Sequence, residues 1–428
     1  MANIVDNPRG GCLLAGLNSN LVAIEGVCPI FHSGPGCCMQ TSAAEQGLSG
    51  NKIAGRMSGN SLVCTNMQEK DVVFGGVRKL ASTVQGAIDV VDADIYFIVV
   101  GCSSGIIGDD VESVAEQFRK NGQPVYAIEA PGFLGDSNQG YEEVWNTFLN
   151  QIIEQRDKQE KLVNLFGIIP YHDPFWSGNI EELARLLNRL GLTVNTFYTN
   201  HQNMENVKNS SAAALNIIVH PWLFESQAKK FESMFGVPYV RIPGLPIGAT
   251  DTTKFLKTVA EKLQLDGALV DEVIKEEEDY VYGFLEQIVG TRSWQRFAIV
   301  GDASSVIGMT KYLTNDLSMT PKYVVVYDEL KTEKEKEKIK QQIERLEYVE
   351  GPEVIFAYNQ FEINQIIKAH EEVSVIIGSA NEKEAVSYLE DVSFLEETFP
   401  VTGRLLLNKA LAGYKGSLSF TEDLFDVL

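Results

Sequence analysis

The stretch DIYFIVV at residues 94–100, followed directly by Gly101 and Cys102, decides the fold. Its apolar positions are nearly continuous and rich in β-branched and aromatic residues, which is typical of a strand buried on both faces of a parallel sheet. The predicted strand ends at a glycine and a thiol. Because ligands of open α/β sheets bind outside the carboxyl ends of the strands, we expect Cys102 to lie at a functional edge.

The rest of the chain repeats an alternation of short apolar runs with segments of helical spacing. Further strands are predicted at residues 27–31, 124–129, 162–169, 193–198, 212–219, 237–241, 296–300, 322–327, 353–356 and 374–377. This pattern is typical of an α/β fold and predicts three Rossmann-like domains, each built on a parallel sheet. We place them at residues 1–158, 159–290 and 291–428, the first of which would bind a cluster or ligand at its cysteines.

Composition and charge exclude several classes of function. The chain has 428 residues, 44% of them hydrophobic, and a formal net charge of −22. Nucleic acids require a basic footprint, so the charge argues against such a partner, and it disfavours an anionic membrane. We see no run of eighteen apolar residues and no signal peptide, so no transmembrane span is predicted. All six cysteines lie between positions 12 and 102, unlike a disulfide framework, which favours the reducing cytoplasm.

Nucleotide-binding motifs are absent from the sequence. The glycine turn at residues 301–305, GDASS, lacks the later glycine of a G-x-G-x-x-G fingerprint, and no G-x-x-x-x-G-K-[ST] phosphate loop occurs. The chain itself is therefore not predicted to be an ATPase.

Three cysteines stand in glycine-rich turns: Cys12, Cys37 and Cys102. Glycine lets the backbone approach a bulky inorganic group, and thiolates on such loops are what an iron–sulfur cluster needs. Their spacings of 25 and 65 residues are not the compact repeats of ferredoxins. Spacing alone leaves a metal site and ordinary buried cysteines equally open.

The other cysteines are interpreted from their neighbours. Cys28 and Cys64 follow apolar residues and are predicted to be small core residues. Cys38 adjoins Cys37, and since neighbouring side chains diverge, only one of the two is expected to bind; the residues leave open which.

Several polar residues near predicted element ends have two possible roles. Asp109 and Asp110 are expected to cap a helix rather than to tune a redox centre. His32 either hydrogen-bonds near a cluster or braces its turn. His172 and His220 follow strand ends in the second domain and could line a cleft, and we assign them no role.

Several motifs, in this order, resemble the nitrogenase component 1 family. They are HSGPGC at 32–37, NMQEKDVVFGG at 66–76, CSSGIIGDD at 102–110, APGFLG at 130–135, FPV at 399–401 and GYKG at 413–416. The similarity is strong over the first 145 residues and colinear afterwards.

The resemblance implies a shared iron–sulfur site. In that family two related subunits each contribute three cysteines to a cluster at their interface, and the matching residues here are Cys12, Cys37 and Cys102. The cluster is an [8Fe-7S] P-cluster in nitrogenases and a [4Fe-4S] cluster in relatives that reduce tetrapyrroles. Either type implies a partner subunit that supplies the remaining ligands.

The resemblance also implies which subunit this is. The family's catalytic α-type subunit holds its cofactor through a further cysteine in the second half and a histidine near the C-terminus. Here no cysteine follows Cys102, and the last histidine is His370, predicted to be structural. The chain is thus expected to be a β-type subunit without catalytic residues of its own.

Such a subunit would relay electrons from an ATP-hydrolysing iron–sulfur reductase to the α-type subunit of an α2β2 complex. The substrate stays open between dinitrogen, a methylthio-alkane and others, with a nitrogenase-like reductase favoured over a dedicated molybdenum enzyme. Two alternatives remain: a scaffold for assembly of the nitrogenase cofactor, and a homodimeric tetrapyrrole reductase with a [4Fe-4S] cluster.

Overall fold

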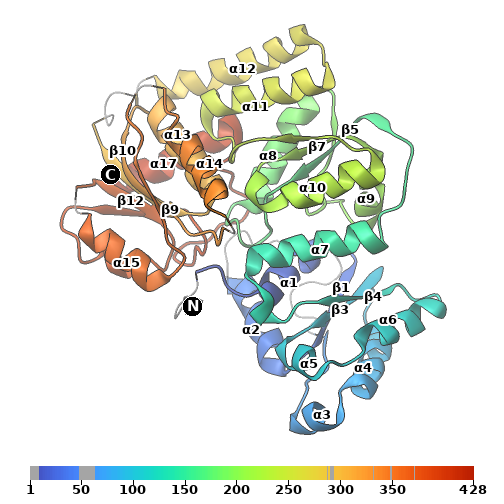
Figure 1. The fold of residues 1–428 in the computed structure, drawn as a ribbon. Coiled ribbons are helices and arrows are strands. Elements are labelled where there is room, and N and C mark those ends of the chain that lie inside the picture. Colours follow the sequence, from blue (N-terminus) through green and yellow to red (C-terminus); the bar gives the residue numbers. More distant parts are fainter. Residues whose placement is uncertain are drawn as a thin grey trace.

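The computed structural model describes residues 9–47, 63–286, 288–289, 294–330, 332–347, 349–370 and 372–428, and side chains 42–47 lie outside the description. The chain forms three α/β parts: the first in blue to cyan, the second in green, and the third in orange to red (Figure 1). Each part contains one sheet, and all strand pairs within the sheets are parallel. The predicted fold class is confirmed. The domain boundaries at 158 and 290 stay a prediction.

The first sheet carries the strand that decided the sequence interpretation. Its order is β2-β1-β3-β4, with bounds Val63–Cys64, Val27–His32, Ile95–Val100 and Val125–Glu129. Every residue of β1 and β3 is buried, as the continuous apolar run of residues 94–100 requires. The carboxyl ends of β1 and β3 are level with each other, because His32 is in register with Val100.

Helices surround this sheet, and three of them begin at the cysteine turns. They are α1 (Leu13–Ala23), α2 (Pro35–Gly47), α3 (Glu69–Phe74), α4 (Val77–Val90), α5 (Cys102–Ile107), α6 (Val111–Lys120) and α7 (Ser137–Gln151), with a 3₁₀ turn η1 at Gly132–Leu134. Cys12 caps the start of α1, Cys37 lies in the first turn of α2, and Cys102 begins α5. All three thiols therefore lie at or near the N-terminus of a helix.

The second sheet has the order β6-β5-β7-β8, with bounds Thr193–Asn195, Gln159–Phe166, Ala213–Ile218 and Tyr239–Arg241. Its helices are α8 (Trp176–Arg189), α9 (Met204–Lys208), α10 (Pro221–Phe235), α11 (Gly248–Leu263) and α12 (Gly267–Leu285), with a 3₁₀ turn η2 at Asn209–Ala212. Trp145 of α7 packs edge-on against Phe166, Phe197 and Phe224, which joins the first part to the second.

The third sheet has the order β11-β10-β9-β12-β13, with bounds Glu353–Phe356, Thr320–Val326, Arg296–Gly301, Val375–Gly378 and Ser393–Glu396. Its helices are α13 (Ala303–Lys311), α14 (Glu333–Glu344), α15 (Gln360–Ala369), α16 (Lys383–Val386) and α17 (Gly413–Val427), with a π-helical turn η3 at Tyr312–Asp316. The last helix, α17, returns to pack on α8, α11 and α12 of the second part.

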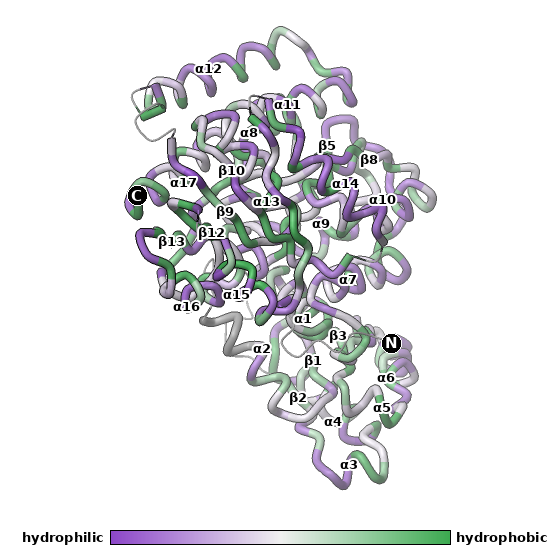
Figure 2. Tube along the Cα trace, turned by 60° about the vertical axis from the view of Figure 1, so that its left-hand side comes forward, coloured by the Kyte–Doolittle hydropathy of each residue, from purple (hydrophilic) through white to green (hydrophobic). Residues whose placement is uncertain are grey.

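One hydrophobic core connects the three parts and is built from buried residues between Leu13 and Leu424. Hydrophobic segments run through the sheets, whereas the outlying helix α12 has mostly hydrophilic turns (Figure 2). Among the described residues, none of the helices combines the length and apolar character that crossing a membrane requires.

A buried arginine ties the start of the described chain to the third part. The side chain of Arg9 is almost fully buried, and its Nη2 donates to Ser379 Oγ at 2.6 Å. Its Nε lies 3.4 Å from Glu382 Oε1, and its backbone N–H donates to Tyr358 O at 2.9 Å. Cys12 follows three residues later, so its turn lies between the first and third parts.

Candidate functional site

The Cys12 and Cys102 turns meet at Gly132. The N–H of Gly132 donates to Cys102 Sγ at 3.1 Å. A Cβ placed on Gly132 would lie 3.4 Å from the sulfurs of both Cys12 and Cys102, so the two thiols flank the same point. The Cys12 turn is fixed there by Leu13 N–H, which donates to Gly135 O at 2.8 Å.

Cys37 completes this group of thiols, whereas its neighbour Cys38 does not. Cys37 is exposed, and Cys38 is only 2% exposed and belongs to the core. Partial burial raises the pKa of Cys37, and the nearby thiols Cys102, Cys12 and Cys64 raise it further. Cys37 therefore lies within electrostatic range of the other two turns and is exposed, as a ligand shared with a partner would be.

Cys28 and Cys64 have different surroundings. Cys28 is fully buried in β1, and burial raises its pKa to about 12, in keeping with the predicted core role. Cys64, which was also predicted as core, packs against the core from the end of β2 but is only half-buried. A hydrogen bond from Cys38 and another from Asn66 N–H, at 3.3 Å, lower its pKa to about 6. Its place at a strand end, rather than its apolar neighbours, was the informative signal.

His32 braces the loops between the cysteine turns. Its ring is fully buried, with Nε2 2.8 Å from Asp109 Oδ2 and Nδ1 3.2 Å from Thr65 Oγ1. Burial lowers the pKa of His32 despite the opposing effect of Asp109, so the ring is neutral. Its backbone oxygen accepts from Gly101 N–H at 3.0 Å and from the Ser104 hydroxyl. Of the two roles considered for His32, bracing is the one these contacts support.

The predicted capping role holds for Asp110 but not for Asp109. Asp110 caps α6 by accepting from Ser113 N–H at 3.0 Å. Asp109 instead accepts from Gly76 N–H at 3.0 Å and pairs with His32. Gly76 must be glycine, because a Cβ there would lie 2.7 Å from Asp109 Oδ2 and 2.8 Å from His32 Cε1.

An exposed apolar patch borders the cysteine turns. Its residues lie on α2, α3, α5 and η1, and they are Met39, Val72, Val73, Phe74, Ile106, Phe133 and Leu134. Phe74 is 87% exposed. Apolar surface concentrated in this way marks an interaction site.

A second candidate site lies where the three parts meet. His172 and His220, which sequence reasoning left without a role, line one inter-domain cavity together with Asp173, Asp302 and Tyr327. His220 Nε2 is 3.5 Å from Asp302 Oδ1, and its buried Nδ1 has no hydrogen-bond partner among the residues that the structure describes. Burial lowers the pKa of His172 to about 4 and raises that of Asp173 to about 7.

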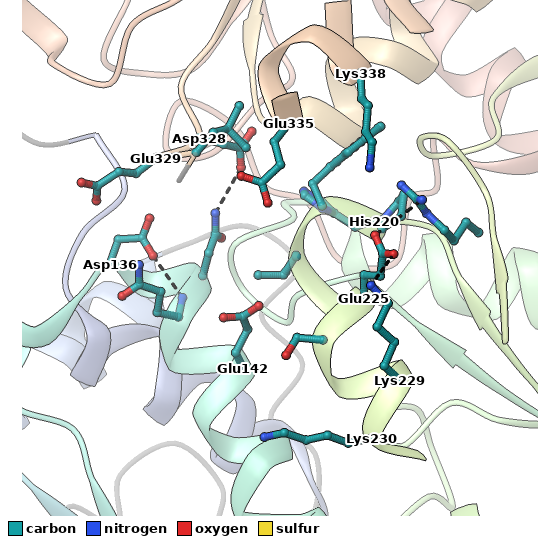
Figure 3. A pocket seen from close by; sticks show the side chains of 18 residues that line it. Asp136, Glu142, His220, Glu225, Lys229, Lys230, Asp328, Glu329, Glu335 and Lys338 are labelled. Carbon is teal, nitrogen blue, oxygen red and sulfur yellow. Dashed lines mark hydrogen bonds and ion pairs between the residues drawn. The ribbon is translucent and has the colours of Figure 1, made fainter. Parts of the chain in front are cut away.

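A groove of about 520 Å³ shares His220, Asp136 and Asn138 with this cavity. Side chains from α7, α10 and α14 face it, with the carboxylates Asp136 and Glu329 on one side and Lys229 and Lys338 on the other (Figure 3). No cysteine is among the described residues that line the cavity or the groove. A thiolate-held cofactor is therefore not supported there.

The three cysteine turns do fit an iron–sulfur group. Their thiols stand at helix N-termini, Cys102 Sγ receives a backbone N–H, and Gly132 leaves the space between two sulfurs free of a side chain. Within the described ranges, three or more His, Cys, Asp or Glu residues nowhere gather closely enough to hold a metal ion within one chain.

Comparison with known proteins identifies the family of this chain. The model of the nitrogenase component 1 type oxidoreductases matches residues 12–428. The chain belongs to this family.

The curated relatives of this component 1 chain include a protein named for cofactor biosynthesis and an alpha chain, both from Clostridium pasteurianum. The nitrogenase iron-molybdenum cofactor biosynthesis protein NifE is 25% identical over 419 residues, covering 96% of this chain and 86% of that protein. The nitrogenase molybdenum-iron protein alpha chain is 27% identical over 289 residues, covering 65% of this chain and 53% of its own. The chain thus spans about half of that alpha chain.

The solved structure of nitrogenase Cp1 at pH 6.5 has the same fold. It superposes with a TM-score of 0.81 at 20% identity, covering 100% of this component 1 chain and 94% of the other. At this identity the likeness concerns the fold alone.

Proposed function

We propose that this chain is one subunit of a nitrogenase-like reductase and holds half of an interfacial iron–sulfur cluster through Cys12, Cys37 and Cys102. The observation that carries the proposal is the convergence of these thiols at one edge of the first sheet, two of them at Gly132. Membership of the component 1 family agrees with it. Three thiols from one chain leave the cluster open, so a partner subunit supplies the other ligands.

The chain's own residues would bind, orient and shield this group. A bound cluster would supply one-electron storage, with an [8Fe-7S] P-cluster proposed and a [4Fe-4S] cluster as the alternative. The N–H of Gly132 donates to Cys102 Sγ, and all three thiols lie at or near the N-terminus of a helix. His32 and Asp109 hold the loops that carry Cys37 and Cys102 in place.

The apolar patch would exclude water once a partner covers it. We propose that an α-type subunit in an α2β2 complex covers part of this surface, and that an ATP-hydrolysing iron–sulfur reductase docks where Phe74 is exposed. Electrons would then pass through the cysteine site toward a catalytic cofactor in the partner. The β-type assignment rests on the absence of a cysteine after Cys102, since the relatives reported above are an alpha chain and NifE.

The test is anaerobic purification from the cytoplasm with the co-expressed partner, followed by iron analysis and electron paramagnetic resonance. About eight irons per interface support a P-cluster and four a [4Fe-4S] cluster. We expect Cys37→Ala to lower the iron content and Cys38→Ala, its matched neighbour, to retain it. A Cys37→Ala complex with full iron content contradicts the ligand assignment.

A scaffold for cofactor assembly is the second candidate, and the match to NifE over 96% of this chain favours it. A scaffold passes bound iron to an apo acceptor protein, whereas a relay subunit keeps its iron and supports turnover with reductase and ATP. Incubating the iron-loaded complex with an apo component 1 acceptor therefore separates the two. Transfer of iron without turnover assigns the scaffold role.

A further inference from the structure

We propose that Lys79 is a positioning residue for docking of the iron–sulfur reductase. It holds α3 in the conformation that exposes Phe74, and it does so without contacting the reductase itself. The inference rests on the proposed function, because it takes the reductase to bind at α3. It goes further by naming the residue that fixes this surface before a partner arrives.

Helix α3 is short and lies at the far edge of the first part, away from the other two parts (Figure 1). Of its six residues only Asp71 is buried, whereas Val73 is 72% exposed and Phe74 is 87% exposed. A helix of this length is not stable through its own hydrogen bonds, and this one buries little apolar surface. Its conformation therefore depends on bonds from neighbouring elements.

Lys79, in the first turn of α4, supplies such bonds. Its Nζ donates to Asn66 O at 2.6 Å and to Asp71 Oδ2 at 2.7 Å. The same carboxylate oxygen accepts from Gln68 N–H at 2.9 Å, which is one half of the capping box of α3. In the part of the chain that the structure describes, no other side chain outside α3 and its cap hydrogen-bonds to residues 68–75.

The place of Lys79 on α4 indicates that these bonds outweigh an electrostatic cost. It is the third residue of the helix, where the positive end of the helix dipole disfavours a cation. Its side chain is only 32% exposed, and the two oxygens take up two of the three N–H donors of the ammonium. The hydrogen bond from Lys79 also lowers the pKa of Asp71, so both partners are charged at neutral pH. The lysine is thus engaged within its own chain.

The two ends of α3 are fixed by other bonds, which confines the effect of Lys79 to α3 itself. Met67 N–H donates to Ser33 O at 3.0 Å before the helix, and Gly76 N–H donates to Asp109 at 3.0 Å after it. Loss of the Lys79 ammonium would therefore release α3 while leaving the cysteine turns in place.

The experiment measures amide hydrogen exchange and the rate of reductase-dependent reduction of the anaerobically purified complex. In Lys79→Met we expect residues 68–75 to lose protection by about tenfold, and the half-saturating concentration of reductase to rise by a similar factor. The maximal rate, dithionite-dependent reduction and iron content are expected to stay as in wild type. Lys79→Arg keeps the charge and the donors and is expected to restore both properties.

Two further variants separate positioning from charge and from direct contact. Arg78→Met is the matched control, because Arg78 is the exposed neighbour of Lys79 and its loss changes the net charge equally; it is expected to behave as wild type. Asp71→Asn removes the partner and keeps the lysine charge. It is expected to reproduce the effects of Lys79→Met, and the double variant is expected to add little to either change.

Three results would overturn the inference. They are unchanged exchange at residues 68–75 in Lys79→Met, an unchanged half-saturating concentration despite faster exchange, and weaker docking in Lys79→Met but not in Asp71→Asn. The last result would assign Lys79 a direct contact with the reductase. A wild-type complex that dithionite reduces and the reductase does not contradicts the proposed function and the docking role together, whereas the exchange result still decides whether Lys79 holds α3.

Discussion

Replacing Asp109 with alanine is expected to loosen the loops that carry Cys37 and Cys102 while leaving the three sheets folded. The substitution removes the acceptor of two buried donors, Gly76 N–H and His32 Nε2–H. An unsatisfied buried donor costs about 1–3 kcal/mol, and water entering the space left by the carboxylate recovers part of this. We therefore expect the local opening free energy to fall by about 3 kcal/mol.

Amide hydrogen exchange is the suitable assay, because a chain with three sheets need not unfold in a single two-state step. A fall of about 3 kcal/mol corresponds to a loss of protection of about 100-fold. It is expected in peptides covering residues 64–80 and 99–105, which contain the amide of Gly76 and the Gly101 amide that donates to His32 O. Peptides from the second and third sheets are expected to exchange as in wild type.

Asp110→Ala is the matched control, one residue away. Asp110 caps α6 through Ser113 N–H, so its loss is expected to affect only the first turns of α6. If Asp109→Ala leaves residues 64–80 protected, or if both variants give the same exchange pattern, the bracing role of His32 and Asp109 is refuted.

Three further changes probe other contacts. His172→Phe is expected to make the free energy of unfolding less sensitive to acid. Because burial holds the pKa of His172 in the folded protein near 4, wild type loses stability as pH falls from about 6.5 toward 4. Denaturant unfolding at several pH values measures the difference between the two proteins. Gly132→Ala is expected to lower iron content, since its Cβ would lie 3.4 Å from two sulfurs, and iron analysis beside an unchanged circular dichroism spectrum checks this. Phe74→Ala, at a residue 87% exposed, is expected to change unfolding free energy by less than about 0.5 kcal/mol. It is also expected to slow reductase-dependent but not dithionite-dependent reduction.

Hydrophobic patterns in the sequence predicted the strands and helices that are buried on one face or on both faces. Residues 94–100 were predicted as a buried strand and form β3 at Ile95–Val100, because a strand covered on both faces must be apolar throughout. By contrast, β13 at Ser393–Glu396 was missed, since four residues with polar ends carry little periodicity. The helix α17 was missed because its residues were interpreted only as a motif.

The cysteine turns could be identified from the sequence, whereas the contacts that support them could not. Glycine turns marked Cys12, Cys37 and Cys102, and their role as ligands stays a prediction. Asp109 pairs with His32, which lies 77 residues earlier, and capping rules consider only residues within one helical turn. Cys64 was predicted as core from its apolar neighbours; it does pack against the core, but the pairing of β2 with β1 places it on an edge strand, where it is only half-buried.

The anchoring of Arg9 has a consequence for the order in which this molecule matures. Arg9 binds Ser379, Glu382 and Phe399, and the ribosome makes Ser379 370 residues after Arg9. The anchor of Arg9 therefore cannot form on a nascent chain until the strands of the third part have been made. Loading of a group that depends on the anchored Cys12 turn is consequently expected to follow synthesis of the third part.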